Sequence, residues 1–260
     1  MSDRRLSVII PTLNERGNIE PLVTRLAQAL NGSGVTWEAI FIDDHSTDGT
    51  FQQLERMVQA GFPIHPYLKV GKRGKAYSLL EGFARAKYDA VAILDADLQC
   101  PPEAIGSMFE HLSNGVDVVV ANRQNTFGNP YRRLASWIFQ EVFAHRLNGL
   151  QVDSQSGLKL FRRQVLESVT LSPSPWTFDM EFLLKAQLAG YAIRGCAVDF
   201  SERTSGKSKI NLWNASIEIV WNALSLWYQH RLPVLSRSMR AGLLGKGRWL
   251  TGLISNRRPF

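Results

Sequence analysis

Cysteine is scarce in this chain, and long apolar runs are absent. Only Cys100 and Cys196 occur among 260 residues, and they lie far apart without metal-ligand spacing. This spacing excludes a disulfide framework and favours a reducing compartment, with both thiols as packing residues. No stretch reaches the roughly 18 uninterrupted apolar residues that a membrane-spanning helix needs.

Acidic residues are absent from the end of the chain. From Arg231 to Phe260 there are seven Arg or Lys and no Asp or Glu, which leaves 23 charges of each sign in residues 1–230. The net charge of +7 therefore comes entirely from the tail. A uniformly basic body would indicate nucleic acid, which we do not expect as a partner. A basic tail with interspersed Leu, Trp and Ile favours an anionic membrane surface.

The two ends of the chain predict a peripheral protein. The N-terminal apolar run is only Leu6 to Ile10, which is too short for a signal peptide. Residues 211–230 carry apolar side chains, three of them Trp, at helical spacing. Such an amphipathic helix either packs on the body or lies in the membrane interface. We expect a body at 1–210, a membrane-associating segment at 211–260, and a cytoplasmic location at the membrane face.

Strand and helix signals alternate along the body. This alternation predicts an α/β fold with a mostly parallel sheet and helices on both faces. The first half is expected to bind a nucleotide and the second an acceptor, in one unit without a linker. Strands are expected at 6–12, 37–44, 63–70, 91–97, 116–122, 157–161 and 191–200, and helices after 18, at 51–59, 75–87, 101–114 and 131–147, and from about 178.

The stretch VAILDADLQCPPE is the strongest chemical signal. An apolar strand ends on Asp95 and Asp97, and Gln99 follows before a Pro-Pro-Glu helix start. Ligands of open α/β sheets bind outside the carboxyl ends of the strands. Two carboxylates and an amide oxygen suit Mg²⁺ or Mn²⁺, which keep other positions for water and phosphates. The alternative is that Asp97 only helps to cap the following helix.

An ordered set of motifs resembles family 2 glycosyltransferases, in particular dolichyl-phosphate mannose synthases and bacterial polyprenyl-phosphate glycosyltransferases. The resemblance covers most of residues 6–210 and implies the GT-A fold and an inverting transfer from a nucleotide sugar. The motifs are PTLNERGNI (11–19), IDDHSTDGT (42–50), DADLQCPPE (95–103), ANR (121–123), DSQSGLKLF (153–161) and RTSGKSK (203–209).

The resemblance implies donor contacts in the first half of the chain. Pro11 and Glu15 match nucleotide-contacting positions, whereas Leu13 stands where Tyr is common and offers no ring to the base. Of the adjacent acids Asp43 and Asp44, the resemblance favours Asp44 as the acceptor of hydrogen bonds from the base or ribose. The complete set expected around the donor in this half is Pro11, Leu13, Glu15, Ile42, Asp44 and Ala96.

Cationic residues are expected around the phosphates. Arg123 follows a strand, and Arg133, or its neighbour Arg132, opens the next helix, although helix starts often expose such pairs. Arg suits phosphate because its planar fork donates parallel hydrogen bonds. Arg203 and Lys209 match charged positions of a loop that closes over the donor in relatives. A solvated basic loop is the alternative.

Acids in the second half are candidates for the acceptor site. Asp153 matches an acid that faces the acceptor in related bacterial enzymes, and with Asp97 it forms the predicted catalytic pair. Asp179 and Glu181 lie near a helix start. Acids at this place stabilise a helix through its dipole whether or not they take part in catalysis. A sugar hydroxyl acceptor would need Asp153 as a base, whereas a lipid phosphate is already ionised at pH 7.

The sequence thus predicts a metal-dependent inverting glycosyltransferase. GDP-mannose is the first expectation for the donor, with UDP-sugars next, and a polyprenyl or dolichyl phosphate for the acceptor. The lipid would be reached at the membrane surface or with a membrane-protein partner. Two alternatives remain at this point: the same donor chemistry with a soluble or glycan hydroxyl, and an inactive homologue acting as a membrane-bound binding module.

Overall fold

The computed structural model describes residues 4–125, 137, 139–147, 149–172, 178–201 and 228. The predicted amphipathic helix and basic tail lie outside this part of the chain, apart from Tyr228. The strands are β1 Arg5–Thr12, β2 Thr36–Asp43, β3 Ile64–Leu68, β4 Ala90–Leu94, β5 Val118–Arg123, β6 Leu158–Arg162 and β7 Ile193–Val198. The helices are α1 Arg16–Asn31, α2 Thr50–Gln59, α3 Lys75–Phe83, α4 Ala104–Ser113, η1 (a π-helix) Phe139–Leu147, α6 Arg163–Ser168 and α7 Phe178–Leu188.

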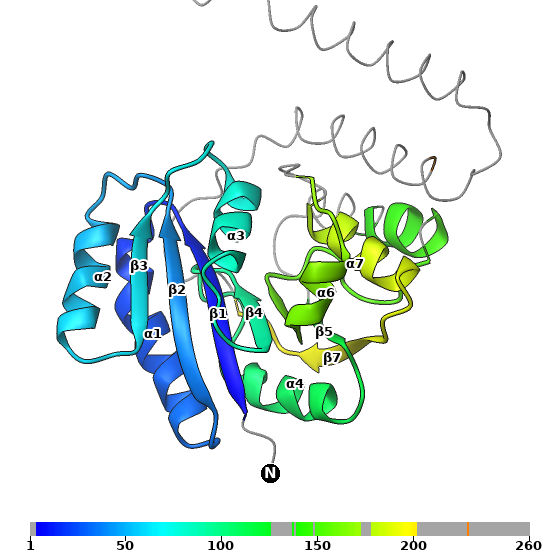
Figure 1. Cartoon of the computed structure of the whole chain (residues 1–260), viewed down its shortest axis with the longest axis horizontal. Helices are drawn as coiled ribbons and strands as arrows, with labels where there is room; N and C mark the ends of the chain where they lie inside the picture. Colours follow the sequence, from blue (N-terminus) through cyan, green and yellow to red (C-terminus); the bar gives the residue numbers. More distant parts are fainter. Residues whose placement is uncertain are drawn as a thin grey trace, which may run out of the picture.

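The described strands form one seven-stranded sheet in the order β3-β2-β1-β4-β6-β5-β7 (Figure 1). Every pairing is parallel except those of β6, which runs antiparallel to both β4 and β5. The carboxyl ends of β1 to β5 therefore meet at the same edge of the sheet. The amino end of β6 joins them there because that strand is reversed. This arrangement confirms the predicted α/β class and defines the edge where a ligand should bind.

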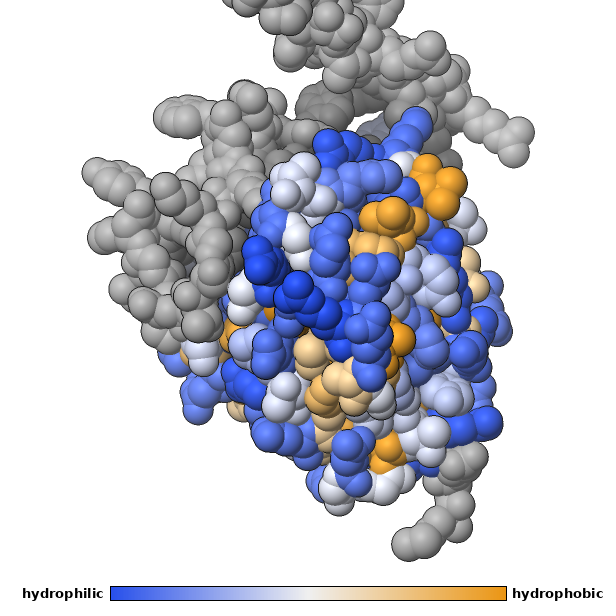
Figure 2. Space-filling view, turned by 90° about the vertical axis from the view of Figure 1, so that its left-hand side faces the viewer, coloured by the Kyte–Doolittle hydropathy of each residue, from blue (hydrophilic) through white to orange (hydrophobic). Residues whose placement is uncertain are grey.

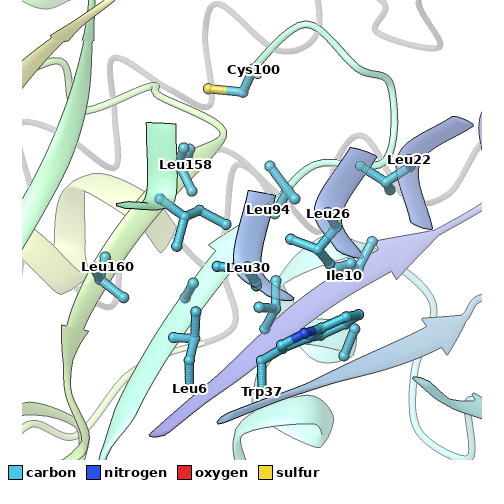
Figure 3. Packing of buried hydrophobic residues seen from close by; sticks show 14 of the residues in the cluster. Leu6, Ile10, Leu22, Leu26, Leu30, Trp37, Leu94, Cys100, Leu158 and Leu160 are labelled. Carbon is cyan, nitrogen blue, oxygen red and sulfur yellow. The ribbon is translucent and has the colours of Figure 1, made fainter. Parts of the chain in front are cut away.

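Two apolar layers cover the sheet because strand side chains alternate between its faces. Leu6 and Ile10 of β1 pack with α1, α2 and α4, whereas Ile9 faces α3, α6 and α7. Figure 3 shows Leu22, Leu26 and Leu30 of α1 directed toward the strands. All three leucines are fully buried, as their helical spacing predicts.

Several element boundaries differ from the predictions, and β4 is the one that matters for the site. It ends at Leu94 rather than at residue 97, so Asp95 and Asp97 lie in the following turn. The Asp97 carboxylate accepts the backbone N–H of Gln99 at 3.1 Å, which bends the chain away from the sheet. Helix α3 ends at Phe83, before the predicted residue 87, because the backbone N–H of Lys87 donates to Ser7 Oγ. The short helix α6 was not predicted.

Replacement of Leu26 by Ala tests the packing of α1. The side chain is fully buried against the sheet, so its loss leaves a cavity. We expect Leu26→Ala to lower the free energy of unfolding by about 3 kcal/mol in urea titrations. Gln28→Ala on the exposed side of the same helix serves as control and should change it by less than about 0.5 kcal/mol. Equal effects of the two changes would contradict the observed helix orientation.

Candidate active site

Three loops at the carboxyl edge of the sheet contain strained backbone. Among the described residues, the non-glycine residues with positive φ are Asn14, His45 and Leu98, with φ of 52°, 58° and 60°. They follow β1, β2 and β4 respectively. Such conformations cost energy and persist at sites where the surrounding structure imposes them. The strain therefore marks the same edge that the acid-containing motifs predict.

Asp95 is held in place by the reversed strand β6. Its backbone N–H donates to the carbonyl of Gly157 at 3.1 Å. A Cβ atom on Gly157 would lie only 2.6 Å from Asp95 Oδ2, so any larger residue would displace the carboxylate. The glycine of the DSQSGLKLF motif is therefore required by the close approach of the acid from the DADLQ motif.

A chain of alternating charges starts at Asp95. The ammonium of Lys75, at the start of α3, lies 2.7 Å from Asp95 Oδ1 and 4.0 Å from Asp179 Oδ2. Asp179 also pairs with Lys159 at 2.8 Å, and the Lys159 side chain is fully buried within the sheet layer. Sequence reasoning assigned no role to either lysine. The apolar run GLKLF contains Lys159, and a Lys within a buried strand is almost always paired with an acid. This pattern could have indicated a buried ion pair.

The pKa values of this cluster reflect a recessed, acid-rich corner. Burial raises the pKa of Asp95, and the negative charges of Asp97 and Asp179 raise it further against the opposing effect of Lys75. Burial acts to lower the pKa of Lys75, but the carboxylates of Asp95 and Asp179 outweigh it and the pKa is raised. The ammonium of Lys75 is thus held in its charged form next to Asp95 and Asp179.

Asp97 and Gln99 complete the predicted metal set. The Asp97 side chain is buried, and that of Gln99 is partly exposed. The helix that follows begins after Glu103, whose own side chain makes no capping hydrogen bond, and the capping role of Asp97 stays an alternative. Within the described residues no cluster of three His, Cys, Asp or Glu side chains could hold a metal. A metal here would therefore depend on the two carboxylates, the Gln99 amide, and ligands from water or the donor.

The two adjacent acids at the end of β2 have different partners. Asp43 is fully buried and accepts hydrogen bonds from Thr12 and Ser46, a structural role. The Asp44 carboxylate lies 3.1 Å from Lys69 Nζ and accepts the backbone N–H of Gly74 at 2.7 Å. Burial acts to raise the pKa of Asp44, but the bonds from Gly74 and Lys69 outweigh it, and the pKa is lowered.

The other donor-side predictions lie around these loops. Glu15 precedes α1, and its carboxylate accepts the side-chain N–H of Asn18 at 2.7 Å. Pro11 and Leu13 are partly exposed at the end of β1. Ile42 and Ala96 are buried in the apolar core, so only their backbone atoms could contact a ligand.

On the acceptor side the structure joins two predicted residues. Arg123, at the end of β5, donates from Nε to Asp153 Oδ2 at 3.1 Å. The other carboxylate oxygen of Asp153 accepts the backbone N–H of Gln155 at 3.0 Å. Gln140 of η1 spans the same loop, because its side chain donates to the Val152 carbonyl and accepts from Ser154. Sequence reasoning missed Gln140, which lies in a helix with no motif of its own.

Cys100 is a buried thiol that directly follows Gln99 in the acid-bearing turn. Burial raises the pKa of Cys100, and the negative charge of Asp95 raises it further. Both Cys100 and Cys196 are free and buried, which confirms their prediction as packing residues. The predicted residues Arg133, Arg203 and Lys209, and Arg132, lie outside the described residues.

The sheet topology and its acid-bearing edge agree with the GT-A fold that the motifs imply. A family model described as "Glycosyl transferase family 2" matches residues 7–170. The chain therefore belongs to glycosyltransferase family 2, as the motifs predicted. Where the structure is described, no helix combines the length and apolar character needed to cross a membrane.

The chain is similar to enzymes that act on lipid phosphates. It is 30% identical over 214 residues to a dolichol-phosphate mannosyltransferase of Pyrococcus furiosus. The matched region covers 79% of this chain and 59% of that protein. It is 28% identical over 207 residues to an undecaprenyl-phosphate 4-deoxy-4-formamido-L-arabinose transferase of Salmonella paratyphi B, with 79% and 62% covered. The chain thus spans about three fifths of the length of these relatives.

A solved structure supports the fold assignment. Glucosyl-3-phosphoglycerate synthase from Mycobacterium tuberculosis, in complex with Mn²⁺, uridine-diphosphate-glucose and phosphoglyceric acid, superposes with a TM-score of 0.64. The match covers 86% of this chain and 80% of that one at 21% sequence identity. At this identity the likeness establishes a shared fold only.

Replacement of Lys75 by Met tests the charge cluster. Lys75 opposes the rise in the pKa of Asp95, so its removal should move the titration midpoint of the Asp95 carboxyl further upward. Carboxyl ¹³C NMR measures this midpoint directly. Lys72→Met, an exposed change in the same loop, is the control and should leave the midpoint where it is in the wild type. An unchanged or lower midpoint in Lys75→Met would contradict the pairing.

Proposed function

We propose that this protein transfers a hexose, with inversion, from a nucleotide sugar to a polyprenyl or dolichyl phosphate. The bond between the anomeric carbon and the donor diphosphate breaks, and an oxygen of the lipid phosphate forms the new bond from the opposite side. The observation that carries the proposal is the Asp95 carboxylate, held by Gly157 beside Asp97 and already paired with the ammonium of Lys75. This corner is organised around a cation.

The acid corner fits a divalent ion by its donor chemistry. Asp95, Asp97 and Gln99 would hold Mg²⁺ or Mn²⁺, and such an ion neutralises charge on the departing diphosphate. The residues of the chain add their own contributions. Lys75 offers a positive charge beside Asp95, and the carboxylates of Asp95 and Asp179 keep that ammonium charged. Asp44 is a deprotonated acceptor for hydroxyl groups of the donor, since its pKa is lowered.

The acceptor side supports a phosphate rather than a hydroxyl. Both oxygens of Asp153 accept hydrogen bonds, from Arg123 and from the backbone of Gln155. A carboxylate occupied in this way is a weak candidate for removing a proton. A lipid phosphate needs no base, because its second pKa is about 6. In that case Asp153 orients Arg123, and the guanidinium binds the acceptor phosphate.

The names of the relatives support a choice of the first donor to test. The mannosyltransferase of Pyrococcus furiosus supports mannose as the transferred sugar, and we take GDP-mannose as the first donor to test. UDP-sugars come next. We further propose that the protein works at the cytoplasmic face of a membrane as a peripheral protein, alone or with a membrane-protein partner, and that residues 211–260 contribute to that contact.

A soluble acceptor is the second candidate. The Mycobacterium tuberculosis protein of the same fold was solved with phosphoglyceric acid, a water-soluble molecule. In this variant of the reaction a hydroxyl attacks and Asp153 must take its proton, which requires Arg123 to move away. The third alternative, an inactive membrane-bound module, is disfavoured because Asp95, Asp97 and Gln99 are all present.

Donor binding should require a divalent ion. We expect one of GDP-mannose, UDP-glucose and a dTDP-sugar to raise the melting temperature, and only together with Mn²⁺ or Mg²⁺. At a donor concentration of about 100 Kd, the stabilisation is about 2.7 kcal/mol, or roughly 5 to 10 °C. Differential scanning fluorimetry measures the shift.

Matched variants make this test specific. Asp97→Asn should abolish the ion-dependent part of the shift, because it removes one of the two carboxylates. Asp89→Asn replaces an acid whose side chain is 91% exposed, outside the site, and should keep the full shift. A donor that raises the melting temperature equally with and without the ion would contradict the metal-dependent mechanism.

The acceptor class can be read from the product. With radiolabelled donor and extracted lipid, we expect label to enter the organic phase when polyprenyl phosphate is present and not with the unphosphorylated polyprenol. Arg123→Gln should lower kcat/KM for the lipid phosphate about 100-fold, as for other lost contacts to a developing or fixed negative charge. Label that stays in the aqueous phase and appears on a soluble hydroxyl would favour the second candidate.

A further inference from the structure

The loop between β3 and α3 exposes apolar side chains without a partner in the described structure. Val70 is 87% exposed and Leu68 is 50% exposed, more than most other apolar side chains of the described part. Figure 2 faces this side of the molecule and shows apolar atoms among a largely hydrophilic surface. A clustered apolar tip of this kind marks an interaction surface more often than a single exposed Leu does.

The exposed charge around this tip is positive. Lys72 and Arg73 are exposed on the same loop, and the Arg73 side chain remains 67% exposed despite its contact with Asp44. The nearby acids are largely buried and paired with cations. The Asp44 side chain is 7% exposed and pairs with Lys69, and the Glu81 side chain is 15% exposed and pairs with Arg85. Three loop cations against the single carboxylate of Asp44 leave a surplus of two positive charges.

Hydrogen bonds hold the backbone of the loop, so the exposed Val70 side chain has a defined position. The backbone N–H of Val70 donates to the Glu81 carboxylate at 3.3 Å. Lys69 Nζ donates to the Gly74 carbonyl at 2.8 Å, which closes the base of the loop. These bonds turn Lys69 inward and leave the neighbouring side chains outward. Little conformational entropy would be lost when Val70 enters an apolar environment.

The loop also lies at the active-site edge. It leaves the carboxyl end of β3 and leads directly into α3, whose first residue, Lys75, contacts Asp95. Figure 1 shows the turn above β3 on the same side as the strand ends. A surface bound by this loop is therefore brought next to the acid corner.

We propose that the loop formed by residues 68–73 docks on an anionic lipid surface. Leu68 and Val70 enter the interfacial layer while Lys72 and Arg73 contact the headgroups. This inference rests on the proposed function in one respect, since a docked membrane would present the lipid phosphate acceptor to the site. A protein partner that adds a strand to β3 is disfavoured, because this edge strand is short and Pro66 lacks a backbone N–H.

Vesicle sedimentation of the full chain tests the proposal. With vesicles containing about 30% phosphatidylglycerol, we expect the double variant Val70→Ser, Lys72→Gln to lose at least about tenfold in affinity. The matched control is Val58→Ser, Arg56→Gln on α2, where Val58 is 41% exposed, and its affinity should stay within about twofold of wild type. Pure phosphatidylcholine vesicles should bind the wild type much more weakly.

The outcomes separate this inference from the proposed function. Unchanged vesicle affinity in the loop variant, or equal binding to neutral and anionic vesicles, overturns the docking role. Loss of a protein complex in place of vesicle binding, seen by size-exclusion chromatography, also overturns it. Reduced vesicle binding in a protein that transfers no sugar to lipid phosphate supports the docking surface and refutes the acceptor. With a short-chain acceptor phosphate free in solution, the loop variant should keep the wild-type kcat/KM.

Discussion

The pairing of β4 with the reversed strand β6 is the constraint on which the site depends. Because β6 runs antiparallel, its amino end lies at the edge where the parallel strands end. Gly157 then lies so close to the Asp95 carboxylate that a Cβ atom at this position would displace it. The same register carries Lys159 into the interior, where it holds Asp179 and, through it, Lys75. One strand reversal thus assembles acids and lysines from four separate segments.

Charge neutralisation offsets the repulsion between the acids of this corner. Carboxylates that lie close together repel one another, and each raises the pKa of the other. Lys75 offsets this repulsion by lying between Asp95 and Asp179. The arrangement keeps carboxylates at the edge of the sheet where we propose that a cation and a diphosphate bind. The positive φ of Leu98 beside them shows that backbone strain is retained at the same place.

The residues that the sequence did not reveal share a physical property. Lys75 and Gln140 act through contacts with segments far away in the chain, and no local pattern records such contacts. Lys159 makes a contact of the same kind with Asp179, and its local signal is a charged residue inside an apolar run. Asp95 and Asp97 could be found because a buried strand followed by acids is itself a local signal. The roles of the donor-side and acceptor-side residues remain predictions, and Arg133, Arg203 and Lys209 lie outside the described residues.

The sequence by itself determined the fold class, the family and the edge of the sheet that bears the acids. Hydrophobic periodicity and ordered motifs are properties of neighbouring residues, so they can be read along the chain. Only the tertiary structure decided that Asp95 lies past the end of its strand, that Arg123 pairs with Asp153, and that Val70 faces outward. Those facts follow from strand register and side-chain direction, which are fixed when distant segments pack together.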